Sequence, residues 1–152
     1  MFEDKYFEGK KIKSRECRFA VYAPPVNFYD PDLHVVKEIL HLDDGSSVPN
    51  LKHVWNYQRP YWIVKKGQQN FKQYIDYIEE ERCNKFFTNQ TQLVENIRSK
   101  VEVTKPFGGL RDVCESPYVF GADIKSTACI KKDYKVKYPD VNTEFTVAVF
   151  DI

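Results

Sequence analysis

The chain has 152 residues, a length that fits one ordinary domain and allows a substantial buried core. Hydrophobic residues make up 42% of it and charged residues 30%, a composition that argues against intrinsic disorder. The formal net charge is only +1, so any contact with nucleic acid has to come from local basic patches. No apolar run approaches the length of a membrane helix, and no membrane partner is expected.

Four cysteines are spread along the chain without any C-x-x-C spacing: Cys17, Cys83, Cys114 and Cys129. Local cysteine pairs are the usual scaffold of a structural zinc site, so such a site is not expected. The N-terminal stretch MFEDKYFEGKKIKSRE is charged from its start and has no apolar signal segment. We therefore expect a reducing, cytoplasmic setting with free and mostly buried thiols.

The first half of the chain has mainly strand character. CRFAVYA, at residues 17–23, is rich in aromatic and β-branched side chains, and a Pro-Pro pair ends it. LHVVKEIL, at residues 33–40, fits a short helix or a strand, because its apolar spacing does not decide between them. HLDDGSSVPN, at residues 41–50, has the composition of a loop, and YWIVKK, at residues 61–66, predicts another strand.

Helical patterns occupy the middle of the chain. QNFKQYIDYIEEERCNKFF, at residues 69–87, predicts an amphipathic helix from apolar side chains at Phe71, Tyr74, Ile75 and Ile78. A second helix is predicted after the cap-type residues 88–91, with its buried side at Leu93, Val94, Ile97 and Val101.

The part after the second predicted helix is less regular. LRDVCES, at residues 110–116, predicts one or two helical turns, and residues 116–140 hold two or three strand-like pieces. The order of strand, mixed segment, strand, helix, helix and strands predicts an α+β fold of mixed strands and helices.

The last segment, EFTVAVFDI at residues 144–152, predicts a strand with apolar side chains on both faces. A strand of this kind normally lies in the centre of a sheet that is covered on both sides. We therefore expect the chain to be the front part of a larger protein. The alternative is an interaction subunit that completes a partner's sheet with this strand.

VAVFDI, at residues 147–152, resembles the opening of the first exonuclease motif of family B DNA polymerases, which continues Asp-Ile-Glu. In that family the Asp and the Glu hold Mg²⁺ ions that activate water against the 3′-terminal phosphodiester. Asp151 matches the Asp and Ile152 matches the residue that follows it. The resemblance implies that Asp151 is a catalytic metal ligand in a completed exonuclease, and the alternative is a solvated carboxylate at a strand end.

Two longer stretches are similar to the same family. Residues 59–81 resemble a strand and helix of the N-terminal domain of phage-type members, and residues 116–140 resemble the passage into the exonuclease. The resemblance implies a polymerase N-terminal domain over residues 1–140 and the first strand of a truncated 3′–5′ exonuclease domain over 141–152. It also implies that this chain by itself is inactive and binds no cofactor. The remainder of the polymerase, in cis or as a separate chain, would complete it in the cytoplasm of an infected host cell.

N-terminal domains of this family lie beside the single-stranded template, and some bind RNA. The stretch that best combines cations with rings is Arg59, Tyr61, Trp62, Lys65 and Lys66. Two further basic stretches are Lys10, Lys11, Lys13, Arg15 and Arg18, and Lys131, Lys132, Lys135 and Lys137. Cations pair with phosphates and bases stack on rings, so these residues predict contact with single-stranded DNA or RNA. Solvated lysines and a buried Trp62 are the alternative.

Besides the interaction subunit described above, two functions are left open by the sequence. The first is the non-catalytic N-terminal fragment of a replicative family B DNA polymerase, which supports template binding and the exonuclease domain. The second is a free-standing module that binds or regulates through single-stranded DNA or RNA.

Overall fold

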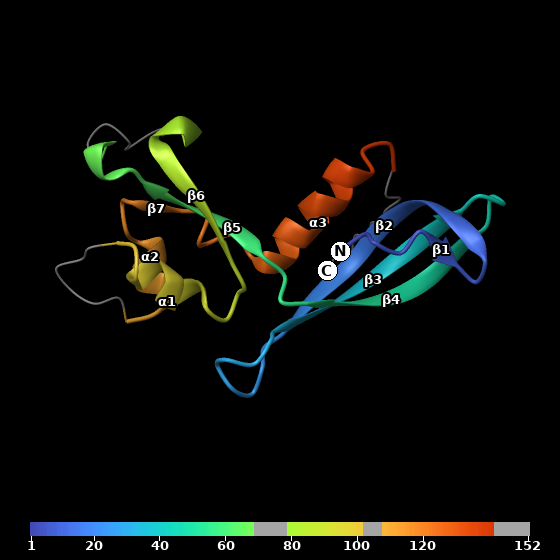
Figure 1. Cartoon of the computed structure of the whole chain (residues 1–152), viewed down its shortest axis with the longest axis horizontal. Coiled ribbons are helices and arrows are strands. Elements are labelled where there is room, and N and C mark those ends of the chain that lie inside the picture. Colours follow the sequence, from blue (N-terminus) through green and yellow to red (C-terminus); the bar gives the residue numbers. More distant parts are fainter. Residues whose placement is uncertain (69–78, 102–107, 142–152) are drawn as a thin grey trace, which may run out of the picture.

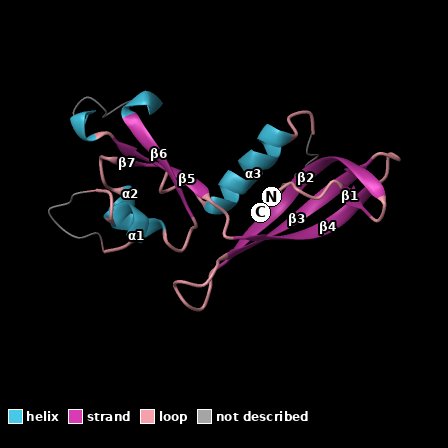
Figure 2. Ribbon diagram, in the orientation of Figure 1, coloured by secondary structure: helices cyan, strands magenta, loops and turns pink. Residues whose placement is uncertain are grey.

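Two antiparallel sheets are joined by a twelve-residue helix in the computed structural model, which describes residues 1–68, 79–101 and 108–141 (Figures 1 and 2). This mixture of strands and helices confirms the predicted α+β fold class. The predicted terminal strand, and with it the exonuclease segment after residue 140, lies outside the described residues except for Val141.

The first sheet has the strand order β1-β2-β3-β4, with every neighbouring pair antiparallel. Its strands are β1 (Tyr6–Phe7), β2 (Lys10–Ala23), β3 (Leu33–Leu42) and β4 (Ser47–Trp55). β2 ends before the Pro-Pro pair, as predicted. Along β3 every second side chain from His34 to Leu42 is buried, a period that fits a strand and not a helix.

β4 corrects the prediction of a loop over residues 41–50. A tight turn around Gly45, whose φ is +85°, is followed directly by a strand that contains Pro49. Proline cannot donate a hydrogen bond to a sheet, but β4 lies at the edge of its sheet, where one side of the strand has no partner strand. The proline therefore does not exclude a strand here.

The second sheet has the strand order β6-β5-β7. Its strands are β5 (Arg59–Val64), β6 (Cys83–Thr88) and β7 (Val119–Phe120), and two 3₁₀ turns lie beside them, η1 (Lys66–Gln68) and η3 (Glu80–Arg82). The helix predicted over residues 69–87 is therefore wrong for its last part. Residues 83–88 pair with β5, so this strand pairing overrides the helical spacing, and residues 69–78 lie outside the described part.

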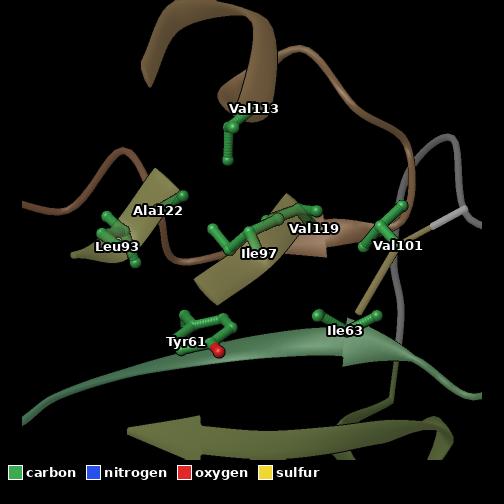
Figure 3. Close-up of a cluster of buried hydrophobic side chains, with 8 residues drawn as sticks. All are labelled: Tyr61, Ile63, Leu93, Ile97, Val101, Val113, Val119 and Ala122. Atoms are coloured by element: carbon green, nitrogen blue, oxygen red, sulfur yellow. The ribbon is translucent and has the colours of Figure 1, made fainter. Parts of the chain in front are cut away.

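Two short helices, α1 (Leu93–Arg98) and α2 (Leu110–Cys114), cover one face of the second sheet (Figure 3). They bring Leu93, Ile97 and Val113 onto Tyr61 and Ile63 of β5. The predicted buried side of the second helix is confirmed at Leu93 and Ile97, which are fully enclosed. These side chains form the core of the smaller sheet.

Helix α3 (Ser126–Lys137) lies between the two sheets (Figure 1). The sequence predicted strand-like pieces here, and the structure corrects this prediction for all but β7. Ser126, Cys129, Ile130 and Tyr134 are buried at helical spacing and pack onto Val36 and other inner residues of the first sheet. Burial of this stripe explains the helix. None of the described helices is long and apolar enough to cross a membrane.

A buried polar network fixes α3 to the first sheet. Arg15 Nη1 donates to Glu38 Oε1 at 2.7 Å, and Asn50 Nδ2 donates to the same oxygen at 2.8 Å. Tyr134 Oη donates to Glu38 Oε2 at 2.6 Å. Burial, together with the carboxylate of Glu38, raises the pKa of Tyr134, so its phenol stays a neutral donor.

The four cysteines are free, as predicted. Only Cys129 is buried, and the other three are partly exposed, which corrects the expectation of mostly buried thiols. Burial raises the pKa of Cys129, and the resulting neutral thiol suits its place in the core against the first sheet.

We predict that Tyr134→Phe lowers the free energy of unfolding by about 1–3 kcal/mol, because it leaves Glu38 Oε2 buried without its donor. Urea unfolding at neutral pH measures this change. Tyr138→Phe is the matched control, since the Tyr138 hydroxyl makes no hydrogen bond to any described residue and the ring contact with Phe2 is kept. Equal effects of the two substitutions would contradict the assigned network.

A candidate nucleic-acid interface

Alternation along β5 sends neighbouring side chains to opposite faces of the second sheet. Tyr61 and Ile63 are buried on the side of α1 and α2 (Figure 3), and Arg59, at the start of the same alternation, is also buried. Pro60 and Trp62 lie on the opposite side and are only partly buried. The second sheet therefore has one face that forms a core and one face on which a ring is accessible.

The strand register places a cation between two rings on the accessible face. Trp62 is paired with Lys85 and Pro60 with Phe87 across the antiparallel ladder. Lys85 Nζ lies 5.2 Å from the centre of the Trp62 ring and 5.5 Å from the centre of the Phe87 ring. Lys85 is exposed and Phe87 is 57% exposed. We call these four residues, Pro60, Trp62, Lys85 and Phe87, the aromatic surface.

A groove of about 270 Å³ lies between the aromatic surface and α3. The groove is also lined by Tyr57, Gln58, Ile124, Ala128, Cys129, Lys132 and Asp133. Lys132 adds a second cation to the lysine of the aromatic surface. The Asp133 carboxylate accepts a hydrogen bond of 2.5 Å from Tyr57 Oη, so one of its oxygens is already occupied. The groove thus offers two rings and two cations within one concave surface.

Tyr57 remains a neutral donor in this groove. Burial and the carboxylate of Asp133 raise the pKa of Tyr57 far above its ordinary value. The hydrogen bond between them joins the segment after β4 to α3 and so fixes the floor of the groove.

Gly121 determines where the Trp62 ring can lie. Its φ is +81°, a conformation that side chains rarely adopt, and a Cβ atom at this position would lie 2.9 Å from Trp62 Cζ3. The indole N–H of Trp62 (Nε1) donates a hydrogen bond to Glu80 Oε1 at 3.1 Å. The ring is therefore held by a backbone that approaches closely and by one hydrogen bond.

We predict that Gly121→Ala destabilises the fold more than Gly45→Ala. Both glycines have φ near +80°, but a Cβ at Gly45 meets no atom within 4 Å. The control therefore costs only the backbone strain of about 1–2 kcal/mol, whereas Gly121→Ala adds a clash worth about 1–3 kcal/mol. Urea unfolding of both variants checks the difference, and equal losses would show that Gly121 does not constrain Trp62.

The stretch predicted to bind nucleic acid is divided between the interior and the surface. Arg59 and Tyr61 are fully buried and do not line the groove, so neither offers its side chain to a phosphate or a base there. Arg59 Nη1 donates to Gln90 Oε1 at 2.8 Å, and the Tyr61 ring stacks on Phe86 with a centroid distance of 5.6 Å. Trp62 is therefore the one residue of this predicted stretch that lines the groove.

Lys65 and Lys66 are exposed just after β5. Lys65 Nζ donates to the carbonyl oxygen of Glu81 at 2.7 Å, which ties the end of β5 to the turn before β6. The structure does not bring either lysine into the lining of the groove.

The two outer basic stretches are also split. Arg15 is buried in its pair with Glu38, while Lys10 pairs with Asp44 at 2.7 Å. The third stretch lies on a helix, so its lysines point to different sides. Lys131 lies 5.9 Å from the ring of Phe19 on the first sheet, and Lys132 lines the groove. Lys132 is thus the one predicted cation that joins Trp62 there.

Lys85 and Phe87 are the site residues that the sequence prediction missed. They stand in CNKFF, which was assigned to the end of a helix although its two adjacent aromatic residues favour strands. The sequence signal that could have identified them is the strand alternation: Lys85 and Phe87 lie on the exposed face, and Phe86 between them packs on the core.

The predicted Mg²⁺ ligand, Asp151, lies outside the described residues. Within the described part of the chain, no group of three or more His, Cys, Asp or Glu side chains could hold a metal ion.

Comparison with known proteins does not assign this surface. No family model, no curated protein and no solved structure matches the chain. The function therefore has to be inferred from the groove and its residues.

Proposed function

We propose that the groove binds single-stranded nucleic acid and that the chain is the non-catalytic N-terminal part of a family B DNA polymerase. The observation that carries the binding proposal is the position of Lys85 between the Trp62 and Phe87 rings, opposite Lys132. Rings beside cations suit single strands, because a base stacks on the ring while a cation neutralises the adjacent phosphate.

The accessible rings of the groove favour a single strand over a duplex. The groove has a volume of about 270 Å³, and Trp62 and Phe87 are among its lining residues. In a duplex the bases are stacked on one another, so their faces are not available to Trp62 or Phe87. An unpaired base can leave its stack at low cost and enter the groove.

The charge of the groove predicts weak, salt-dependent binding. Lys85 and Lys132 can neutralise about two phosphates, which corresponds to a slope of log K against log salt of magnitude about 1–2 for a single strand. Base stacking on Trp62 and Phe87 supplies an additional contribution of about 1–3 kcal/mol per base that does not depend on sequence.

The polymerase part of the proposal rests on the sequence resemblance at residues 59–81, 116–140 and 147–152. In this proposal the groove guides template strand or RNA, and the remainder of the enzyme, in cis or as a second chain, supplies the catalytic groups. Asp151 would hold Mg²⁺ in the completed exonuclease, and the isolated chain would bind without catalysing any reaction.

A free-standing binding module is the second candidate. The observation that favours it is that residues 57–62, 85–87 and 124–133 of this chain supply both the rings and the cations of the groove. The test is to mix the chain with a second chain that carries the remaining polymerase motifs. Polymerase activity of the mixture, with no activity of either chain alone, would support the polymerase proposal over the free-standing module.

We predict that Phe87→Ala weakens binding of a labelled single-stranded oligonucleotide by about tenfold, equivalent to about 1.4 kcal/mol, because one stacking ring is lost. Fluorescence anisotropy at low salt measures the change. Lys85→Ala is expected to weaken binding and to lower the salt slope by about 0.7.

Phe19→Ala is the matched control for the lost ring. Phe19 is 58% exposed and lies near a lysine, as Phe87 does, but it stands on the first sheet outside the groove. Binding that is unchanged in Phe19→Ala and weakened in Phe87→Ala supports the groove. Equal losses in both variants, or binding without salt dependence, would overturn the proposal.

A further inference from the structure

Two arginines of this chain are buried completely, and they differ in how their charge is compensated. Arg15 makes an ion pair of 2.7 Å with Glu38. Arg59 is equally buried, but it donates only to the neutral oxygens of Gln90 and Gly121, and no described carboxylate makes an ion pair with it. Its Nε has no hydrogen-bond partner in the described part of the chain.

A buried charge without a counter-ion is costly, and natural proteins usually pair it. Burial lowers the pKa of Arg59, which reflects the same cost. The two neutral acceptors orient the guanidinium but do not neutralise its positive charge. The positive charge of Arg59 would therefore stabilise an anion bound close to it.

Arg59 lines a second hollow, which we call the α3 cleft. It has a volume of about 260 Å³ and lies at the first turn of α3. Besides Arg59 and residues 122–127, its lining comprises Tyr22, Gln90 and Leu110. The volume exceeds that of a phosphate group and is comparable to that of one nucleotide.

The first turn of α3 is open toward an anion. No side chain caps the helix, no acidic residue stands in its first turn, and the N-cap residue is Lys125. The first backbone N–H groups of a helix, here those of Ser126 and Thr127, have no carbonyl partner within the helix, and the helix dipole adds positive potential there.

The cleft contains one carboxylate, that of Asp123, which is exposed. Its charge is one of the influences that favour the protonated guanidinium of Arg59. Arg59 and Lys125 outnumber it, and the helix terminus adds further positive potential. The net charge of the residues that line the cleft is therefore positive, although the whole chain is close to neutral.

We propose that the α3 cleft is a phosphate-binding site, in which the Ser126 and Thr127 N–H groups bind the phosphate and the Arg59 and Lys125 charges balance it. The same chemistry is present in free phosphate, in a nucleotide and in the phosphodiester of a strand. Ile124 lines both the α3 cleft and the groove, so the two hollows are adjacent. The proposal does not depend on nucleic-acid binding in the groove.

The test is a titration of the isotope-labelled chain of 152 residues with inorganic phosphate, followed by NMR, with chloride at equal ionic strength as the reference. We expect the amide signals of Ser126 and Thr127 to shift to saturation with phosphate and not with chloride. Equal responses to the two anions, or no shift of these amides, would overturn the proposal.

Lys125→Glu is the first variant, because its side chain is exposed and its replacement leaves the core intact. It is expected to weaken phosphate binding at least about tenfold. Lys137→Glu, the same change at the opposite end of α3, should leave binding within about twofold, since helix-dipole effects are confined to the terminal turns. Equal affinities of the two variants would contradict the site.

Arg59→Met tests the buried cation itself. It should abolish the phosphate response while the chain stays folded, because an apolar side chain of similar length removes an uncompensated charge. Retained phosphate affinity in the folded variant would exclude Arg59 from the site. If the variant does not fold, the two lysine variants still decide the question.

Two competition experiments identify the natural source of the phosphate. One uses a nucleoside monophosphate, and the other uses an oligonucleotide that lacks terminal phosphates. Displacement of inorganic phosphate by the oligonucleotide assigns the site to a strand, and displacement by the mononucleotide alone assigns it to a free ligand. Phe87→Ala should leave the phosphate titration unchanged, so failure of the groove and failure of the α3 cleft can be told apart.

Discussion

The alternation of side chains between the two faces of β5 is the constraint on which the rest of the structure depends. Tyr61 and Ile63 take one face of the strand and build the core under α1 and α2, which leaves Trp62 on the other face. Pairing with β6 then decides which residues accompany Trp62. A register shifted by one residue would turn Trp62 toward the core and place Tyr61 in the groove, so core and candidate site depend on the same ladder.

Helix α3 connects this strand to the larger sheet. Tyr134 binds the buried carboxylate of Glu38, and on the same helix Asp133 accepts a hydrogen bond from Tyr57 beside the groove. At its first turn, Ser126 Oγ lies 2.8 Å from His34 Nε2 of β3. Burial lowers the pKa of His34, so this contact remains between neutral groups at physiological pH. Both hollows next to α3 are therefore bounded by a helix with several fixed contacts.

The sequence predicted those elements whose local signals agree with their tertiary surroundings. The end of β2 at a Pro-Pro pair, β5 itself and the buried positions of α1 are of this kind. Residues 83–87 and 126–137 were assigned to the wrong class, because strand pairing with β5 and burial between two sheets decided their structure. For the candidate site, Trp62 and Lys132 were predicted, but the inward direction of Arg59 and Tyr61 follows only from knowing which face of β5 is covered.

The central claim is that a base stacks on Trp62, and the emission of that indole tests it most directly. In a Trp55→Phe background Trp62 is the sole tryptophan of the chain. The account predicts that a single-stranded oligonucleotide quenches this emission to saturation and that added salt reverses the quenching. An oligonucleotide that binds without changing the emission of Trp62, or that does not bind at all, would contradict it.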